Sequence, residues 1–234
     1  MGTEFSPRLN SANPDPRVAC ALLLDTSGSM EGEAIAEMNK GFELFCHEIK
    51  KDPVAKKRTE VAVITFGGSV ELKIPFTEGR NLVPAAFAAS GQTPMGGALK
   101  LAVREVSAQK QAYKDAGLEY FQPWLFIITD GAPTDTAEFD EAVTQIAELE
   151  RAQGITVFSV LVGGSAEKDQ LSRLSAIRPP ISLKGLEFSS LFTWLSASMG
   201  AVANSRASGS NDAGIATAAA MNQNPLAPPG WASW

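Results

Sequence analysis

One stretch constrains the fold of this 234-residue chain more than any other. The residues from Val18 to Leu24 are all apolar, and the run ends abruptly in Asp25-Thr26-Ser27-Gly28-Ser29. An uninterrupted apolar run of this length predicts a strand buried on both faces, as in a parallel sheet. The short, polar, glycine-containing segment that follows predicts a turn outside the carboxyl end of that strand. Open α/β sheets bind their ligands at this place.

The polar residues of the turn indicate a metal ligand set. Asp25, Ser27 and Ser29 present one carboxylate and two hydroxyl groups at alternate positions. Oxygen donors of this kind favour a hard divalent cation. The turn contains no thiolate or imidazole, which are the ligands that would favour Zn²⁺. Mg²⁺ is therefore the expected ion, with Mn²⁺ and Ca²⁺ as alternatives.

The rest of the chain alternates between strand-like and helix-like segments. Apolar residues recur at steps of three and four in the segment after the first strand, which predicts an amphipathic helix. The expected strands are 17–24, 60–66, 70–76, 123–129, 155–162 and 181–183, and the expected helices are 31–51, 82–88, 94–112, 137–153, 167–176 and 189–203. This alternation predicts an α/β fold, a doubly wound, Rossmann-like central sheet with helices on both faces.

Composition divides the chain into three parts. Residues 1–16 are polar and contain three prolines, which predicts a flexible N-terminal arm. Residues 17–203 form the folded domain. Residues 204–234 are rich in Ala, Ser, Asn and Gly, which predicts a flexible C-terminal tail. Trp231 and Trp234 end this tail, and they are interpreted either as interface anchors or as residues that fold back onto the domain.

Charge and cysteine content exclude several classes of protein. The net charge of −6 and the pI of about 5.0 argue against nucleic acid as the main partner. No apolar run is long enough to cross a membrane, and the N-terminal residues do not resemble a secretory signal. Cys20 and Cys46 are expected to be buried free thiols, as is usual in a reducing compartment. These features predict a cytoplasmic protein.

Three ordered motifs carry a resemblance to a known family. Asp25-Thr26-Ser27-Gly28-Ser29 resembles the DxSxS signature of von Willebrand factor A domains. Thr93, in the loop Ser90 to Gly97, matches the threonine of the family's second loop, and Asp130, after an apolar strand, matches the aspartate of the third. One such motif alone is a weak signal, but three in the family's order are specific.

The resemblance implies both a fold and a site. The fold is the family's mostly parallel central sheet with one antiparallel edge strand. The site is the metal-ion-dependent adhesion site, the MIDAS, in which Ser27 and Ser29 bind Mg²⁺ directly. Thr93, Asp25 and Asp130 then bind it directly or through water, and one coordination position stays open for an acidic residue of a partner protein.

The segment Ile128 to Asp135 and the segment Phe192 to Ser198 are similar to the bacterial TerY-like subgroup of the family. That subgroup is linked to tellurite-resistance and stress operons. The resemblance therefore implies a protein–protein interaction module in a phosphorylation-linked stress response, with a serine/threonine kinase and a PP2C-type phosphatase as candidate partners.

Two other functions are alternatives to this module. An extracellular adhesin of the same family is one, although the chain shows neither a signal sequence nor a disulfide framework. A metal-dependent phosphohydrolase is the other, although Ser27 stands where such an enzyme would carry its second carboxylate, so no enzymatic activity is expected. A third interpretation gives Asp25 and Asp130 only a helix-capping role, but capping does not require Ser27, Ser29 and Thr93.

Overall fold

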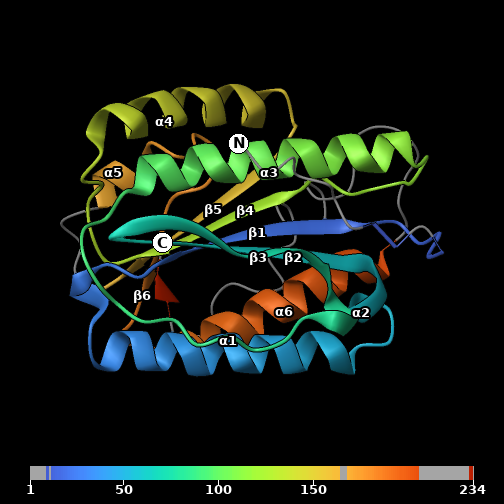
Figure 1. Cartoon of the computed structure of the whole chain (residues 1–234), viewed down its shortest axis with the longest axis horizontal. Coiled ribbons are helices and arrows are strands. Elements are labelled where there is room, and N and C mark those ends of the chain that lie inside the picture. Colours follow the sequence, from blue (N-terminus) through green and yellow to red (C-terminus); the bar gives the residue numbers. More distant parts are fainter. Residues whose placement is uncertain (1–8, 11, 164–167, 206–231, 234) are drawn as a thin grey trace.

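The computed structural model describes residues 9–10, 12–163, 168–205 and 232–233 (Figure 1). Its strands are β1 (Val18–Asp25), β2 (Thr59–Gly67), β3 (Ser69–Glu78), β4 (Trp124–Thr129), β5 (Thr156–Val162), β6 (Ile181–Leu183) and β7 (Ala232–Ser233). Its α-helices are α1 (Glu33–Lys51), α2 (Ala55–Arg58), α3 (Met95–Asp115), α4 (Thr136–Arg151), α5 (Lys168–Ser172) and α6 (Phe188–Asn204). Two 3₁₀ turns, η1 (Gly28–Met30) and η2 (Gly79–Asn81), complete the described elements.

The strands form one sheet in the order β3-β2-β1-β4-β5-β6-β7. Strands β2, β1, β4, β5 and β6 are parallel, whereas β3 pairs antiparallel with β2. The chain moves from β1 to β2 and β3 on one side, then returns to place β4 on the other side of β1. The sheet therefore has its topological switch point between β1 and β4, which is where a doubly wound sheet opens a crevice.

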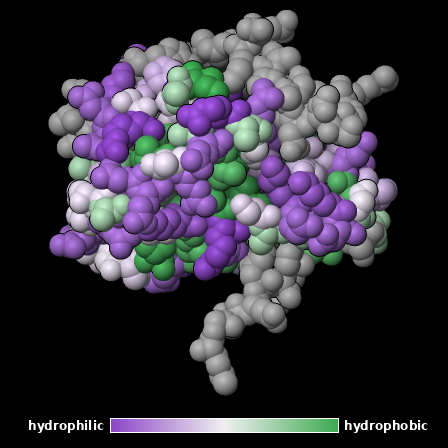
Figure 2. Space-filling view, turned by 90° about the horizontal axis from the view of Figure 1, so that it is seen from above, coloured by the Kyte–Doolittle hydropathy of each residue, from purple (hydrophilic) through white to green (hydrophobic). Residues whose placement is uncertain are grey.

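Successive residues of β1 alternate between two hydrophobic cores. Val18, Cys20, Leu22 and Leu24 belong to the core under α1 and α6, and the residues between them belong to the core under α3 and α4. Figure 1 shows these two helix layers on opposite faces of the sheet. Both faces are covered, so the apolar run of β1 has no polar interruption. Viewed over α3 and α4, the outer surface is mostly hydrophilic (Figure 2).

The predicted fold class and most predicted elements are confirmed. The antiparallel hairpin at the sheet edge is β2–β3, as expected. The two-residue β7 adds an antiparallel pair with β6 at the opposite edge, which the sequence did not predict. Cys20 and Cys46 are both free and buried, and burial raises the pKa of the Cys46 thiol to about 12. No helix within the described residues is both long and apolar enough to cross a membrane.

The helix predicted at 82–88 is wrong. Residues 82–94 have no regular secondary structure and run from η2 to the start of α3. Leu82 and Phe87 are buried in the core beside α1. The Asn39 amide accepts a hydrogen bond from the Phe87 N–H at 2.8 Å and donates one to the Phe87 carbonyl at 2.9 Å. This side chain satisfies backbone groups that a helix would otherwise have paired.

The residues before β1 contact the domain through Arg17, which is completely buried. Its guanidinium Nε donates to Glu60 Oε1 at 3.1 Å, and its terminal nitrogens donate to the carbonyls of Asn10, Asn13 and Asp15. The Asn13 side chain in turn donates to the Lys57 carbonyl at 2.7 Å. Arg17 therefore holds the described part of the preceding segment against the domain. The domain limits and the flexibility of residues 1–16 and 204–234 stay predictions.

Candidate metal centre

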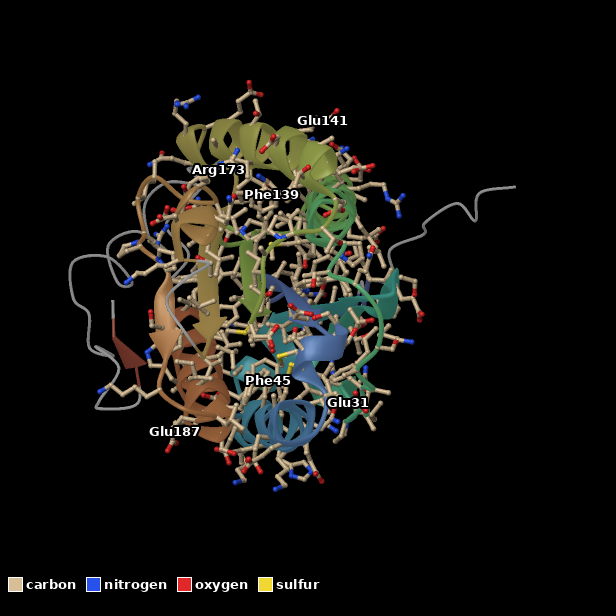
Figure 3. The ribbon with its side chains drawn as sticks, turned by 90° about the vertical axis from the view of Figure 1, so that its left-hand side faces the viewer. Glu31, Phe45, Phe139, Glu141, Arg173 and Glu187 are labelled. Atoms are coloured by element: carbon tan, nitrogen blue, oxygen red, sulfur yellow. The ribbon has the colours of Figure 1, made fainter. Side chains whose placement is uncertain are left out.

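Three loops meet outside the carboxyl ends of β1 and β4. The first follows β1 and contains η1, the second is the end of the irregular segment 82–94 that leads into α3, and the third joins β4 to α4. Figure 3 looks onto this end of the sheet, with Glu31 labelled directly after η1. The loops carry the five predicted site residues: Asp25, Ser27, Ser29, Thr93 and Asp130.

The first loop turns back on its own carboxylate. Asp25 Oδ1 accepts a hydrogen bond from the Ser27 N–H at 2.8 Å, which fixes the turn. The Ser27 and Ser29 hydroxyl oxygens lie 3.1 Å apart, so both point to the same side. Asp25 and Ser27 are buried, whereas Ser29 is exposed. The loop therefore presents a buried carboxylate and a buried Ser27 hydroxyl beside the exposed hydroxyl of Ser29.

The second loop is held against the first by backbone hydrogen bonds. The Gly28 N–H donates to the Gly91 carbonyl at 2.9 Å, and the Ser90 N–H donates to the Thr26 carbonyl at 2.8 Å. Gly91 has a φ of +71°, and a Cβ there would lie only 2.4 Å from the Gly68 Cα. Glycine at this position is required both by its backbone conformation and by the close approach of the β2–β3 hairpin.

The third loop brings Asp130 to the first. Ser29 donates a hydrogen bond to Asp130 Oδ1 at 2.7 Å. The Thr129 hydroxyl, at the end of β4, donates to Asp25 Oδ2. Asp25, at the end of β1, is thus linked to the end of β4, and Asp130, after β4, is linked to the loop after β1. Both links cross the switch point of the sheet.

Thr93 completes the group. A methyl group placed on Gly131 would lie 3.8 Å from Thr93 Oγ1 and 4.0 Å from Ser29 Oγ. Gly131 follows Asp130 directly, so all three loops approach one another around it. The structure therefore brings together the oxygens of all five residues that the sequence singled out.

The electrostatics of this cluster favour a bound cation. Burial raises the pKa of Asp25, hydrogen bonds from Thr129 and Ser27 lower it, and the nearby Asp130 carboxylate raises it further. Among the described residues, no Lys or Arg forms an ion pair with either carboxylate. A divalent ion would supply the positive charge that this pair lacks.

The donor set fits Mg²⁺ in chemistry. It consists of two carboxylates and three hydroxyls, all hard oxygen donors, and it includes no histidine or cysteine. His47, the sole histidine of the chain, is exposed on α1. Ser29 is exposed and Asp130 is half-buried, so a bound ion would keep positions open to water or to another molecule's oxygen.

Two residues of this region were not predicted from sequence. Thr129 holds the Asp25 carboxylate, and its signal was a hydroxyl at the end of an otherwise apolar strand. Asp135 accepts hydrogen bonds from the Gly96 and Gly97 N–H groups at 2.9 and 2.8 Å. Its only signal was an acidic residue just before a predicted helix, which normally indicates a cap for that same helix.

With this fold and this arrangement, the chain belongs to the von Willebrand factor type A domain family, whose sequence model matches residues 20–183. No curated protein was found to match the chain in sequence.

Solved structures share the fold at low sequence identity. The vWF domain of the type V pili tip protein Mfa5 from Porphyromonas gingivalis is similar with a TM-score of 0.59 and 8% identity, over 84% of this chain and 99% of that one. The pilus adhesin SpaC from Lactobacillus rhamnosus GG gives a TM-score of 0.58 and 12% identity, over 79% of this chain. Proximal thread matrix protein 1 from the mussel byssus gives 0.51 and 16%, over 80% of this chain.

The matched region is only part of two of these proteins. The alignment covers 49% of the mussel protein and 30% of SpaC. At these identities the likeness establishes the shared fold alone.

Proposed function

We propose that this chain is a metal-dependent protein–protein interaction module whose MIDAS holds Mg²⁺ and, through it, an acidic residue of a partner protein. The observation that carries the proposal is the convergence of Asp25, Ser27, Ser29, Thr93 and Asp130 from three loops at the switch point of the sheet. The von Willebrand factor A family supports the interaction role, and no catalytic residue is assigned.

The charge of the chain explains why the ion is needed. The chain carries a net charge of −6, so an acidic partner residue would be repelled on approach. Ser27, Ser29 and Thr93 are neutral, so a Mg²⁺ that contacts Asp25 or Asp130 only through water keeps net positive charge and attracts a carboxylate. The ion thus provides the local attraction that the protein's own charge opposes.

The partner system is proposed from the TerY-like resemblance. A serine/threonine kinase and a PP2C-type phosphatase in a cytoplasmic, tellurite- or stress-related response are the candidates. An adhesin role is the second candidate, because SpaC is a pilus adhesin and Mfa5 is a pili tip protein. Fractionation of the source cell separates the two, since only the first requires a cytoplasmic protein.

Calorimetric titration with Mg²⁺ tests the metal site itself. Wild type should bind one ion, Asp25→Ala should abolish binding, and Ser27→Ala should weaken it less, since Asp25 is the buried anionic ligand. Thr144→Ala is the matched control, because Thr144 is exposed on α4 and its hydroxyl contacts only its own helix backbone at Asp140. Equal Mg²⁺ binding by Asp25→Ala and wild type would refute the metal site.

A further inference from the structure

The α3 helix receives its N-terminal cap from a residue beyond β4. Asp135 Oδ1 accepts a hydrogen bond from the Gly96 N–H at 2.9 Å, and Asp135 Oδ2 accepts one from the Gly97 N–H at 2.8 Å. The helix begins at Met95 after Pro94, whose side chain offers no acceptor. One carboxylate from the third loop therefore satisfies two of the free N–H groups at the start of α3.

The same contact region fixes the backbone of Thr93. The Thr93 carbonyl accepts hydrogen bonds from the Met95 N–H at 2.8 Å and from the Thr134 N–H at 2.9 Å. Thr134 directly precedes Asp135 in the chain. The third loop thus fixes Thr93 in two ways. Thr134 binds the Thr93 carbonyl, and Asp135 binds the first turn of α3, which begins two residues after Thr93.

Glycine at position 96 makes this arrangement possible. A Cβ on Gly96 would lie 2.2 Å from the Phe139 nitrogen and 2.5 Å from the Glu138 carbonyl carbon, both in α4. The first turns of α3 and α4 therefore touch backbone to backbone, and Figure 3 shows them side by side near the labelled Phe139. At this separation Asp135 reaches α3 while its own carbonyl accepts the first backbone bond of α4 from Phe139 at 2.9 Å.

We propose that Asp135 is a positioning residue for the metal site: it sets the place of the Thr93 hydroxyl by capping α3 from the third loop. Its carboxylate is already committed to two N–H groups, so it acts through Thr93 and not as a ligand. This inference rests on the proposed function, because it concerns the same ion, and it adds a determinant of which ion the site prefers.

Ion preference follows from the rigidity of the Thr93 loop. Mg²⁺ requires near-ideal octahedral geometry at short distances, whereas Ca²⁺ accepts variable ligand numbers and longer distances. A Thr93 loop that has lost its anchor should therefore disfavour Mg²⁺ more than Ca²⁺. A general loss of stability would leave the ratio of the two affinities unchanged in the folded protein.

The test compares Asp135→Ala, Asp135→Asn and a matched control. Asp52→Ala is that control, because Asp52 Oδ1 also caps two backbone N–H groups, those of Val54 and Ala55 at 2.8 and 2.9 Å. Asp52 follows the last residue of the 19-residue α1. At 1.5 Å per residue this places it about 28 Å from the helix start next to η1. Mg²⁺ and Ca²⁺ affinities are measured by calorimetry well below each variant's melting temperature.

Asp135→Ala should weaken Mg²⁺ binding about tenfold, at the lower end of the effect of residues that orient metal ligands. The Ca²⁺ to Mg²⁺ affinity ratio should shift toward Ca²⁺, Asp135→Asn should recover part of the loss, and Asp52→Ala should change neither affinity. In metal-free protein, hydrogen exchange of the Gly96 and Gly97 amides should accelerate in Asp135→Ala but not in Asp52→Ala.

The failures are distinguishable. If wild type binds neither ion, the proposed function fails and this inference falls with it. If wild type binds Mg²⁺ and both Asp135 variants bind it equally well with an unchanged ion ratio, only the positioning role is overturned. If Asp135→Ala does not fold, the Ca²⁺ to Mg²⁺ affinity ratio of Asp135→Asn decides. A shift toward Ca²⁺ relative to wild type supports the positioning role, and an unchanged ratio overturns it.

Discussion

Ser29 donates a hydrogen bond to Asp130 Oδ1 at 2.7 Å, joining two loops that are 101 residues apart in sequence. The hydroxyl is exposed and the carboxylate half-buried, so this link lies at the open side of the cluster. A cation between these oxygens would take over the link, because the Ser29 oxygen would offer it a lone pair. Ser29 is therefore the residue whose loss should most cleanly separate metal binding from folding.

Ser29→Ala should lower Mg²⁺ affinity at least tenfold and reduce the free energy of unfolding of metal-free protein by only about 1 kcal/mol, the usual value of one exposed hydrogen bond. Ser69→Ala is the matched control, since Ser69 also donates from an exposed hydroxyl to a carboxylate, Glu71, at 3.1 Å. Titration calorimetry and denaturant unfolding measure the two effects. Equal Mg²⁺ affinity in Ser29→Ala and Ser69→Ala would remove Ser29 from the ligand set.

Thr93→Ala should leave the fold intact and weaken the binding of Mg²⁺ and of a metal-dependent partner. Only the hydroxyl and a methyl group are lost, while the backbone bonds of Thr93 to Met95 and Thr134 remain. Thr93→Ser keeps the oxygen and should retain most of the affinity. Circular dichroism controls for the fold, and if the alanine and serine variants bind Mg²⁺ alike, the hydroxyl is not a ligand.

Asp25→Asn should abolish Mg²⁺ binding yet raise the melting temperature of the metal-free protein at pH 7. Burial, with help from Asp130, raises the pKa of Asp25 in the folded protein. Ionisation of Asp25 therefore destabilises the folded state, and the wild-type protein loses stability as the pH rises through that pKa. Asparagine can still accept the hydrogen bond from the Ser27 N–H.

The gain of Asp25→Asn should therefore shrink as the pH falls toward about 4, the pKa of aspartate in an unfolded chain. Thermal unfolding in the presence of EDTA, from pH 7 down to pH 4, measures it. If the metal-free Asp25→Asn variant melts below wild type at pH 7, the argument is contradicted, because hydrogen bonds to the charged carboxylate would then outweigh the cost of its burial.

Local sequence patterns predicted most of this architecture because the relevant physics is local. The apolar run before Asp25 required a doubly covered strand, and the polar residues at its end had to emerge at the sheet's carboxyl edge. Asp25, Ser27 and Ser29 followed from the end of this run, whereas Thr93 and Asp130 were assigned through the resemblance to the von Willebrand factor A motif. Their joint position depends on the switch point, which only the order of strands determines.

The failures of sequence reasoning all involve contacts between distant segments. Residues 82–88 were predicted to form a helix, but Asn39 of α1 pairs with the backbone N–H and carbonyl of Phe87 instead. Asp135 sits where a residue normally caps its own helix, yet it caps α3. No pattern within either segment encodes these partners.

Arg17 and Glu60 form a buried ion pair at the opposite end of the sheet, with side-chain exposures of 0% and 4%. Glu60 also accepts hydrogen bonds from Gln109 and Tyr113, both at 2.6 Å. Burial raises the pKa of Glu60, while Tyr113, Arg17 and Gln109 oppose the shift. Glu60→Leu should therefore reduce the free energy of unfolding by about 3–5 kcal/mol, because it leaves a buried guanidinium without its counter-ion.

The double variant Arg17→Met with Glu60→Leu should recover much of that loss, since a buried ion pair can be replaced by apolar residues of similar volume. Denaturant unfolding of the two single variants and the double variant gives the coupling energy. Mg²⁺ affinity should be unchanged in all three. Additive losses in the double variant would show that Arg17 and Glu60 stabilise the fold independently.

Deleting residues 225–234 should lower the melting temperature only slightly. Of these residues the structure describes Ala232 and Ser233, which pair with Leu183 and Ser182 of β6; Trp231 and Trp234 lie outside the described residues. The few backbone hydrogen bonds of so short a pair are worth about 1 kcal/mol each at most. Replacing Ala232 and Ser233 by proline removes the same backbone donors from the full-length chain and should match the deletion in stability.

If the tryptophans anchor a partner or a second copy, only the deletion should weaken that association, as measured by sedimentation. A loss above about 3 kcal/mol in the isolated monomer, comparable to emptying a core position, would instead show that the C-terminal residues belong to the domain's own core.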